Sequence, residues 1–298
     1  MHCEAPLQYS APGRFPLLVV AVLISLVACG AALAQEAAPT ETSYVIDRIP
    51  YVIKRPGIYV VRNGLVIKTS TGTAITVEPD VADFTIDLGG HVISNSAPAN
   101  GTNLSIGIEV SGSGMMVIRN GVLSGFGTGV STVNAVAQTT TTIENVTCAG
   151  CGTLGIETSN GNDVTVSHCI VQDTGFNGNF EHIGIGVFGR NIQISDCRVV
   201  NTISTNNTNG GAFGIRLSAG SCGVVSNCFV AGDGGESSYG ISISTQENAG
   251  NTMAVANTIF RCATGILFGD SGGDKYEGNL TQNCGTPYSG GISVGTNN

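Results

Sequence analysis

The sequence predicts an all-β protein wound as a parallel β-helix, and three observations carry this prediction. The 298-residue chain is 42% hydrophobic but only 11% charged and contains 43 glycines, a composition typical of strands and tight turns. Short runs such as TVSHCIV and IQISDCRVV alternate apolar and polar residues, and no window shows a sustained helical stripe. A line that starts with Gly followed by Ile or Val recurs along the chain at Gly107, Gly129, Gly155, Gly184, Gly214, Gly240, Gly265 and Gly291. No single line can bury its own apolar face, so each coil must cover the next.

The N-terminal segment is predicted to direct export. Arg14 precedes the apolar run FPLLVVAVLISLVA, and the small-residue motif ALA follows it, so we predict a signal peptide at 1–34 and a linker at 35–43. The alternative is a lipoprotein signal that ends before Cys29 and leaves the protein anchored to a membrane. Either route places the protein outside the bacterial cytoplasm, secreted, in the periplasm or at the cell surface.

Residues 44–68 are predicted to form an N-terminal cap, and residues 69–298 a β-helix of about nine coils. The basic residues of the cap are Arg48, Lys54, Arg55, Arg62 and Lys68. We interpret them as a solvated rim, with attraction to an acidic surface as the alternative. The formal net charge of -9 argues against nucleic acid as a partner, because phosphates require a basic face. At the other end no cap is evident after Val294, so we hypothesise weak self-association through the C-terminal coil.

The repeat also predicts which residues become neighbours between coils. An inward column is predicted to contain Ile108, Val130, Ile156, Ile185, Ile215, Ile241, Ile266 and Ile292. A column of polar turn residues with left-handed backbone is predicted to contain Asn120, Asn145, His168, Asp196, Asn227, Asn257 and Asn283.

The cysteines follow the same repeat. Cys169, Cys197, Cys228 and Cys284 share one phase, with Thr258 in the gap. We expect buried free thiols there, because strand spacing is slightly wide for a disulfide. Cys148 and Cys151 form a C-x-x-C that is compatible with a local disulfide, and the sequence leaves the pairing open.

Three segments resemble a known family. IPYVIKRPGIYVVRNGLVIKT, FTIDLGGHVIS and MMVIRNGVLSGFGTGV are similar to the opening of repeat proteins of the pectin-lyase-like superfamily, over about residues 44–298. The resemblance implies a single-stranded right-handed parallel β-helix. It implies no single activity, because the superfamily includes polysaccharide lyases, hydrolases, epimerases and tail-spike adhesins. The DD and RxK signatures of its pectate lyases and polygalacturonases are absent from this sequence.

The candidate site lies where the coils lengthen. Three successive coils carry extra residues between the cysteine strand and the next Gly-Ile strand, at 172–183, 201–213 and 231–239. Insertions at one corner of adjacent coils stack into one wall, where functional loops of solenoids gather. The strand face beside this wall is predicted to present Glu109, Ser131, Glu157, Gly186, Arg216, Ser242 and Leu267, with a notch at Gly186.

The predicted catalytic residues are Glu157, His182, Arg216 and Tyr239, and the predicted substrate-binding residues are Asp173, Asp233 and Glu236. Splitting or epimerising a uronate requires that its carboxylate be neutralised and that a proton leave and return at C5. Arg216 would neutralise the carboxylate, and His182 or Tyr239 would exchange the proton. Alternatively, Glu157 and Asp173 would serve as the paired carboxylates of a glycosidase.

Two further motifs carry less weight. GDSGGD at 269–274 is similar to the nucleophile segment of trypsin-like proteases but lies inside a repeat, without that family's histidine segment. Asp270, Asp274 and Glu277 match no calcium motif, so no cofactor or metal is predicted.

Two functions therefore remain open. The first is an exported protein that binds or modifies polysaccharide or envelope glycan, with lyase-like or C5-epimerase-like activity on uronates. The second is a non-catalytic structural or adhesive surface protein. The sequence alone does not decide whether the protein is an enzyme.

Overall fold

A computed structural model describes residues 42–97, 103–132, 135, 139–175, 181–203, 211–218, 222–244, 251–269 and 273–298. The chain divides into two compact units, Met1–Thr40 and Glu41–Asn298, and every described residue belongs to the second. The predicted signal peptide, most of the predicted linker and Cys29 lie outside the described residues. None of the described residues belongs to a helix that is long and apolar enough to span a membrane.

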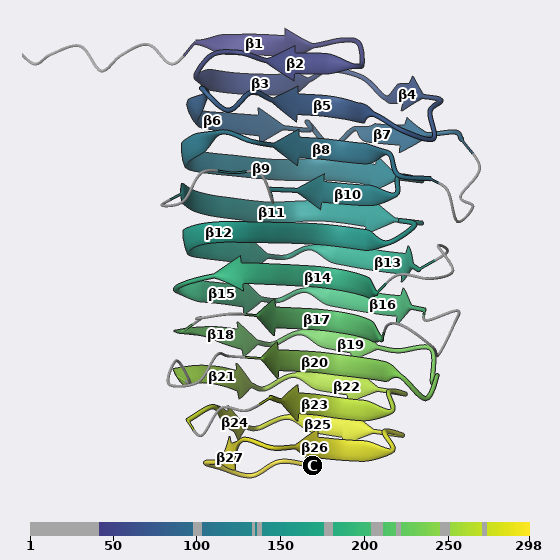
Figure 1. The fold of residues 1–298 in the computed structure, drawn as a ribbon, viewed down its shortest axis with the longest axis vertical. Helices are drawn as coiled ribbons and strands as arrows, with labels where there is room; N and C mark the ends of the chain where they lie inside the picture. The colour runs from purple at the N-terminus through teal and green to yellow at the C-terminus, as the bar shows by residue number, and fades with distance from the viewer. Residues whose placement is uncertain are drawn as a thin grey trace, which may run out of the picture. The chain divides into compact units, whose positions relative to one another are not determined.

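Every regular element in the described residues is a β-strand, and the strands stack in parallel as three columns (Figure 1). Column A contains β2 (Tyr51–Ile53), β5 (Thr73–Val77), β8 (Ile106–Val110), β10 (Thr128–Ser131), the first part of β12 (Leu154–Ser167), β14 (His182–Gly189), β17 (Ala212–Ser218), β20 (Ser238–Ser244), β23 (Thr264–Phe268) and β26 (Thr286–Ser289). Column B contains β1 (Ser43–Ile46), β3 (Gly57–Val61), β6 (Ala82–Asp87), the first parts of β9 (Ser113–Ser124) and β11 (Thr139–Ala149), the second part of β12, β15 (Ile192–Ser195), β18 (Cys222–Ser226), β21 (Asn251–Val255), β24 (Lys275–Glu277) and β27 (Ile292–Ser293). Column C contains β4 (Leu65–Ile67), β7 (Val92–Asn95), the second parts of β9 and β11, β13 (Ile170–Thr174), β16 (Arg198–Thr202), β19 (Phe229–Ala231), β22 (Thr258–Phe260) and β25 (Leu280–Gln282). From β2 onward the chain passes through A, B and C in turn, which is the predicted parallel β-helix, and β1 precedes this order in column B.

The inward column confirms the predicted repeat. Ile156 pairs with Ile185, and Ile185 pairs with Ile215, so residues of successive lines become vertical neighbours. The fully buried members of the column are Ile108, Val130, Ile156, Ile185, Ile215, Ile241 and Ile266. The prediction is wrong for Ile292, which pairs with Lys275 in column B and is 46% exposed. Tyr288 stands next to Ile266 instead, because the last coil is shorter than the five coils before it.

The turn from column B to column C uses left-handed residues, as predicted. Those with φ between 54° and 59° are Asn120, Asn145, His168, Asp196 and Asn227. The next two positions differ from the prediction. Ala256, with φ of 53°, adopts the left-handed conformation in place of Asn257. Asn283 is left-handed as predicted, with φ of 55°, but it lies in the turn from column C to column A.

The cysteine column differs from the prediction at its C-terminal end. Cys169, Cys197 and Cys228 are buried, and the position after Cys228 is occupied by Asn257, whose Oδ1 accepts the Cys228 N–H at 3.0 Å. Cys284 does not belong to this column, because the pairing of β22 with β25 stacks it next to Cys262 at another corner. The eight cysteines in the described part of the chain are free thiols, including the C-x-x-C pair.

The segment predicted as a cap forms the first coil and, through β1, part of a further coil at the N-terminal end. Residues 44–68 contribute β1, β2, β3 and β4, which pair within the same three columns as the later strands. The basic residues of this segment lie in the connections between these strands. The N-terminal end of the solenoid is therefore built from ordinary strands with charged corners.

Candidate functional site

The outward row of column A contains the residues that the sequence predicts, although Ser131 and Ser242 are buried rather than exposed. Strand pairing aligns Glu109, Ser131, Glu157, Gly186, Arg216, Ser242 and Leu267 in successive coils. The three lengthened connections follow β13, β16 and β19 and precede β14, β17 and β20, so all three join column C to column A (Figure 1). Parallel stacking thus places one row of side chains beside one corner of the solenoid.

Glu157 lies in this row between Ser131 and Gly186. Burial raises the pKa of its carboxyl group above the ordinary value of 4.5, because removal from water disfavours the charged form. A Cβ added at Gly186 would lie 3.3 Å from Ile183 Cγ2 and 3.6 Å from Phe188 Cε2. The predicted notch is therefore bordered by two apolar side chains.

Arg216 is the best-organised charged group of the row. Its Nη1 forms an ion pair with Oε2 of Glu181, and its guanidinium carbon lies 4.8 Å from the centre of the Phe213 ring. Phe213 in turn stacks on Tyr239, with ring centres 4.9 Å apart and planes 11° apart. A planar guanidinium packed on an aromatic ring loses little further freedom when it binds a carboxylate.

Glu181 is the residue that the sequence interpretation missed. It directly precedes His182 at the end of the first lengthened connection, and its side chain reaches Arg216 in the next coil. The sequence signal for this ion pair was only that Glu181 is an acidic residue in one of the lengthened connections. Spacing along the chain does not reveal a partner one coil away.

His182 is buried at the start of β14. Its side chain is 1% exposed, and a Cβ added at Gly175 would lie 3.1 Å from its Nδ1. It aligns with Ala212 in the next coil, whereas the outward Ile183 aligns with Phe213. An imidazole buried to this extent cannot reach a polymer on the outer face of this structure.

The predicted rim residues have different surroundings. Asp173 Oδ1 accepts a hydrogen bond from Asn201 Nδ2 at 3.0 Å, and Asp233 Oδ1 accepts the Gly235 N–H at 2.9 Å. Both carboxylates therefore support turns of the backbone. Asp173 also belongs to column C, whereas Glu157 belongs to column A, so the structure does not present them together on one strand face.

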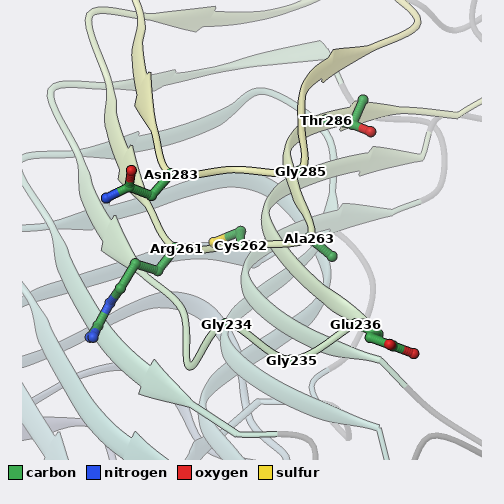
Figure 2. Close-up of a pocket in the computed structure, with 9 residues that line it drawn as sticks. All are labelled: Gly234, Gly235, Glu236, Arg261, Cys262, Ala263, Asn283, Gly285 and Thr286. Atoms are coloured by element: carbon green, nitrogen blue, oxygen red, sulfur yellow. The ribbon is translucent and has the colours of Figure 1, made fainter.

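Glu236 borders an open cavity of ≈ 480 Å³ (Figure 2). It lies in the connection from column C to column A that precedes β20, three coils after the coil of Glu157. The lining residues are Gly234, Gly235, Glu236, Arg261, Cys262, Ala263, Asn283, Gly285 and Thr286. Arg261 and Asn283 extend to one side of the turns and Glu236 to the other. The cavity adds charged and amide groups to the corner beside Tyr239.

No group of three His, Cys, Asp or Glu side chains within the described ranges is arranged to hold a metal ion. Asp270, one of the three acidic residues considered for calcium, lies outside the described residues. Asp274 is fully buried and accepts the Thr252 N–H at 2.9 Å. Its carboxylate has a structural contact inside the coil.

Strand pairing defines the chain as a parallel β-helix protein, the architecture that the resemblance to the pectin-lyase-like superfamily implies. No protein-family model and no curated protein matches the sequence. Among solved structures, endopolygalacturonase I from Stereum purpureum, complexed with two galacturonates, is 16% identical over 86% of this chain and 90% of that chain, with a TM-score of 0.46. ORF18 of Geobacillus virus E2 is 10% identical over 97% of this chain and 65% of that chain, with a TM-score of 0.33. These similarities concern the course of the chain and transfer no activity to it.

Proposed function

We propose that this exported protein binds an acidic, uronate-containing polysaccharide along the outer face of column A. The observation that carries the proposal is Arg216, which lies in the outward row, packs on Phe213 and holds the carboxylate of Glu181. A guanidinium that accommodates one carboxylate at the surface has the geometry to exchange it for the carboxylate of a sugar.

The shape of the face supports a polymer rather than a small ligand. Successive coils repeat at about 4.8 Å, so equivalent side chains form a straight row along the solenoid axis. Such long regular surfaces are how repeat proteins bind extended partners. Tyr239 lies in the coil next to Arg216, and the cavity bordered by Glu236, Arg261 and Asn283 continues the polar surface.

Substitution of Arg216 tests the proposal. Affinity for polygalacturonate and alginate is measured at low salt with the wild type, Arg216→Gln, Arg216→Lys and the control Arg190→Gln, which changes an exposed cation outside the row. Loss of a charge-assisted hydrogen bond predicts at least a tenfold weaker affinity for Arg216→Gln, with partial retention in Arg216→Lys. Equal affinity of Arg216→Gln and the wild type, or equal binding of neutral dextran, would contradict the proposal.

Chemical modification of the bound polymer is the second candidate, and the raised pKa of Glu157 favours it. A carboxyl group that keeps its proton at higher pH suits general-acid catalysis. Such an enzyme would release reducing ends or, as a lyase, products that absorb near 232 nm, and Glu157→Gln would abolish turnover while binding persists. Binding without turnover on any uronate polymer would instead favour the adhesive function.

A further inference from the structure

We propose that the N-terminal end of the solenoid docks onto an anionic membrane surface. The contact is a basic ring of exposed residues in the first coil, Arg48, Lys54, Arg55, Arg62 and Lys68. This proposal is independent of polysaccharide binding on column A, because it uses another part of the molecule.

The ring follows from the connections of the coil. Arg48 lies between β1 and β2, Lys54 and Arg55 between β2 and β3, Arg62 between β3 and β4, and Lys68 directly after β4. Every connection from β1 to β5 therefore carries a cation. β1 stacks on β3, so this segment makes a little more than one coil, and at about 4.8 Å per coil the five charges lie within about two levels around the end of the solenoid. Charges arranged around one end can contact a flat surface together.

The charge of the remaining chain orients this end. Residues 42–68 contain five basic residues and one acidic residue, whereas residues 69–298 contain six basic and seventeen acidic residues. A negative plane therefore attracts the N-terminal end and repels the body. Lys54 forms an ion pair with Glu78 at 3.0 Å, but side-chain exposures of 65% and 42% make the pair weak and easily exchanged.

A membrane fits the ring better than a soluble polymer does. A linear polymer follows a face along the axis, whereas the ring encircles the axis. Val52 and Val66, which are 45% and 66% exposed, add apolar surface to the same coil.

Vesicle sedimentation of the full chain tests the proposal. Vesicles of phosphatidylcholine alone are compared with vesicles that contain about one third phosphatidylglycerol, at low salt and at about 1 M salt, where screening shortens to about 3 Å. Apolar contacts contribute equally to both vesicle types, so the ratio of the two partition coefficients isolates the charge effect. We expect a clear preference for anionic vesicles at low salt that disappears at high salt.

Variants assign this preference to the ring. Each cation removed is expected to lower the ratio about fivefold, so Arg48→Gln, Arg55→Gln, Arg62→Gln and Lys68→Gln together should abolish it. Combined Arg48→Lys, Arg55→Lys and Arg62→Lys should retain it, as should the control Arg190→Gln with Lys275→Gln. Equal partitioning of the wild type on both vesicles, or wild-type behaviour of the four-glutamine variant, would overturn the proposal. Alginate binding that the four-glutamine variant loses, without vesicle binding, would assign the ring to a polymer instead.

Discussion

Glycines that start successive lines lie where adjacent coils approach closely. A Cβ at Gly184 would lie 2.5 Å from the Gly214 carbonyl oxygen, and a Cβ at Gly155 would lie 2.5 Å from that of Gly184. We expect Gly184→Ala to lower the free energy of unfolding by about 1–3 kcal/mol, because the added methyl group overpacks the coil. Urea denaturation measures the change. The control is Gly64→Ala, where the nearest atom is 3.6 Å away, and a similar loss in both variants would contradict the explanation.

Glu157 predicts a pH-dependent stability. Its pKa is raised by burial, so the protonated carboxyl stabilises the fold below pH 4.5, and this contribution is lost as the pH rises through the higher pKa of the folded state. We therefore expect Glu157→Gln to be more stable than the wild type at neutral pH and equally stable well below pH 4.5. Thermal unfolding at both pH values measures the difference. An advantage that does not grow with pH would contradict the assigned burial.

Between elements, asparagines replace the cysteine column near the C-terminal end. Asn279 Oδ1 accepts two hydrogen bonds from Asn257, one from the backbone N–H at 2.9 Å and one from the side-chain Nδ2 at 3.0 Å. Asn279 Nδ2 donates to the Ala254 carbonyl oxygen at 2.9 Å. Asn279 is 1% exposed, so its loss leaves buried polar groups without these partners. We expect Asn279→Ala to cost about 1–3 kcal/mol of unfolding free energy in urea. The exposed neighbour Gln282→Ala should be nearly neutral, and equal effects would contradict a role for the ladder.

Strand faces were predictable from the sequence because alternation fixes which side chains point inward and the repeat fixes which of them stack. This reasoning places Ile156 and Ile185 in one column and Glu157 and Arg216 in one outward row. It fails for Ile292 because the distance between glycines does not reveal that the last coil is short. It also misses the Glu181 ion pair and the burial of His182, since both depend on how a connection folds against the next coil.

At the scale of the whole molecule, the two proposed contacts lie on different surfaces of the solenoid. The basic ring belongs to the connections of β1 to β4 at one end of the solenoid, whereas Arg216 lies in β17, in a later coil (Figure 1 shows these strands). A solenoid docked by its end would hold its side faces clear of the membrane. Polysaccharide binding and membrane docking would then occur together, and variants of Arg216 and of the ring should affect only their own contact.

Hydroxyl-radical footprinting with and without oligogalacturonate tests most directly whether stacked repeats create one binding face. We predict that the ligand lowers oxidation of Tyr239, in column A beside Arg216, and leaves Met253, in column B of the same coil, unchanged. Met115, which is 58% exposed in column B, provides a second control. Protection of Met253 or Met115 without protection of Tyr239, at saturating ligand, would contradict the account.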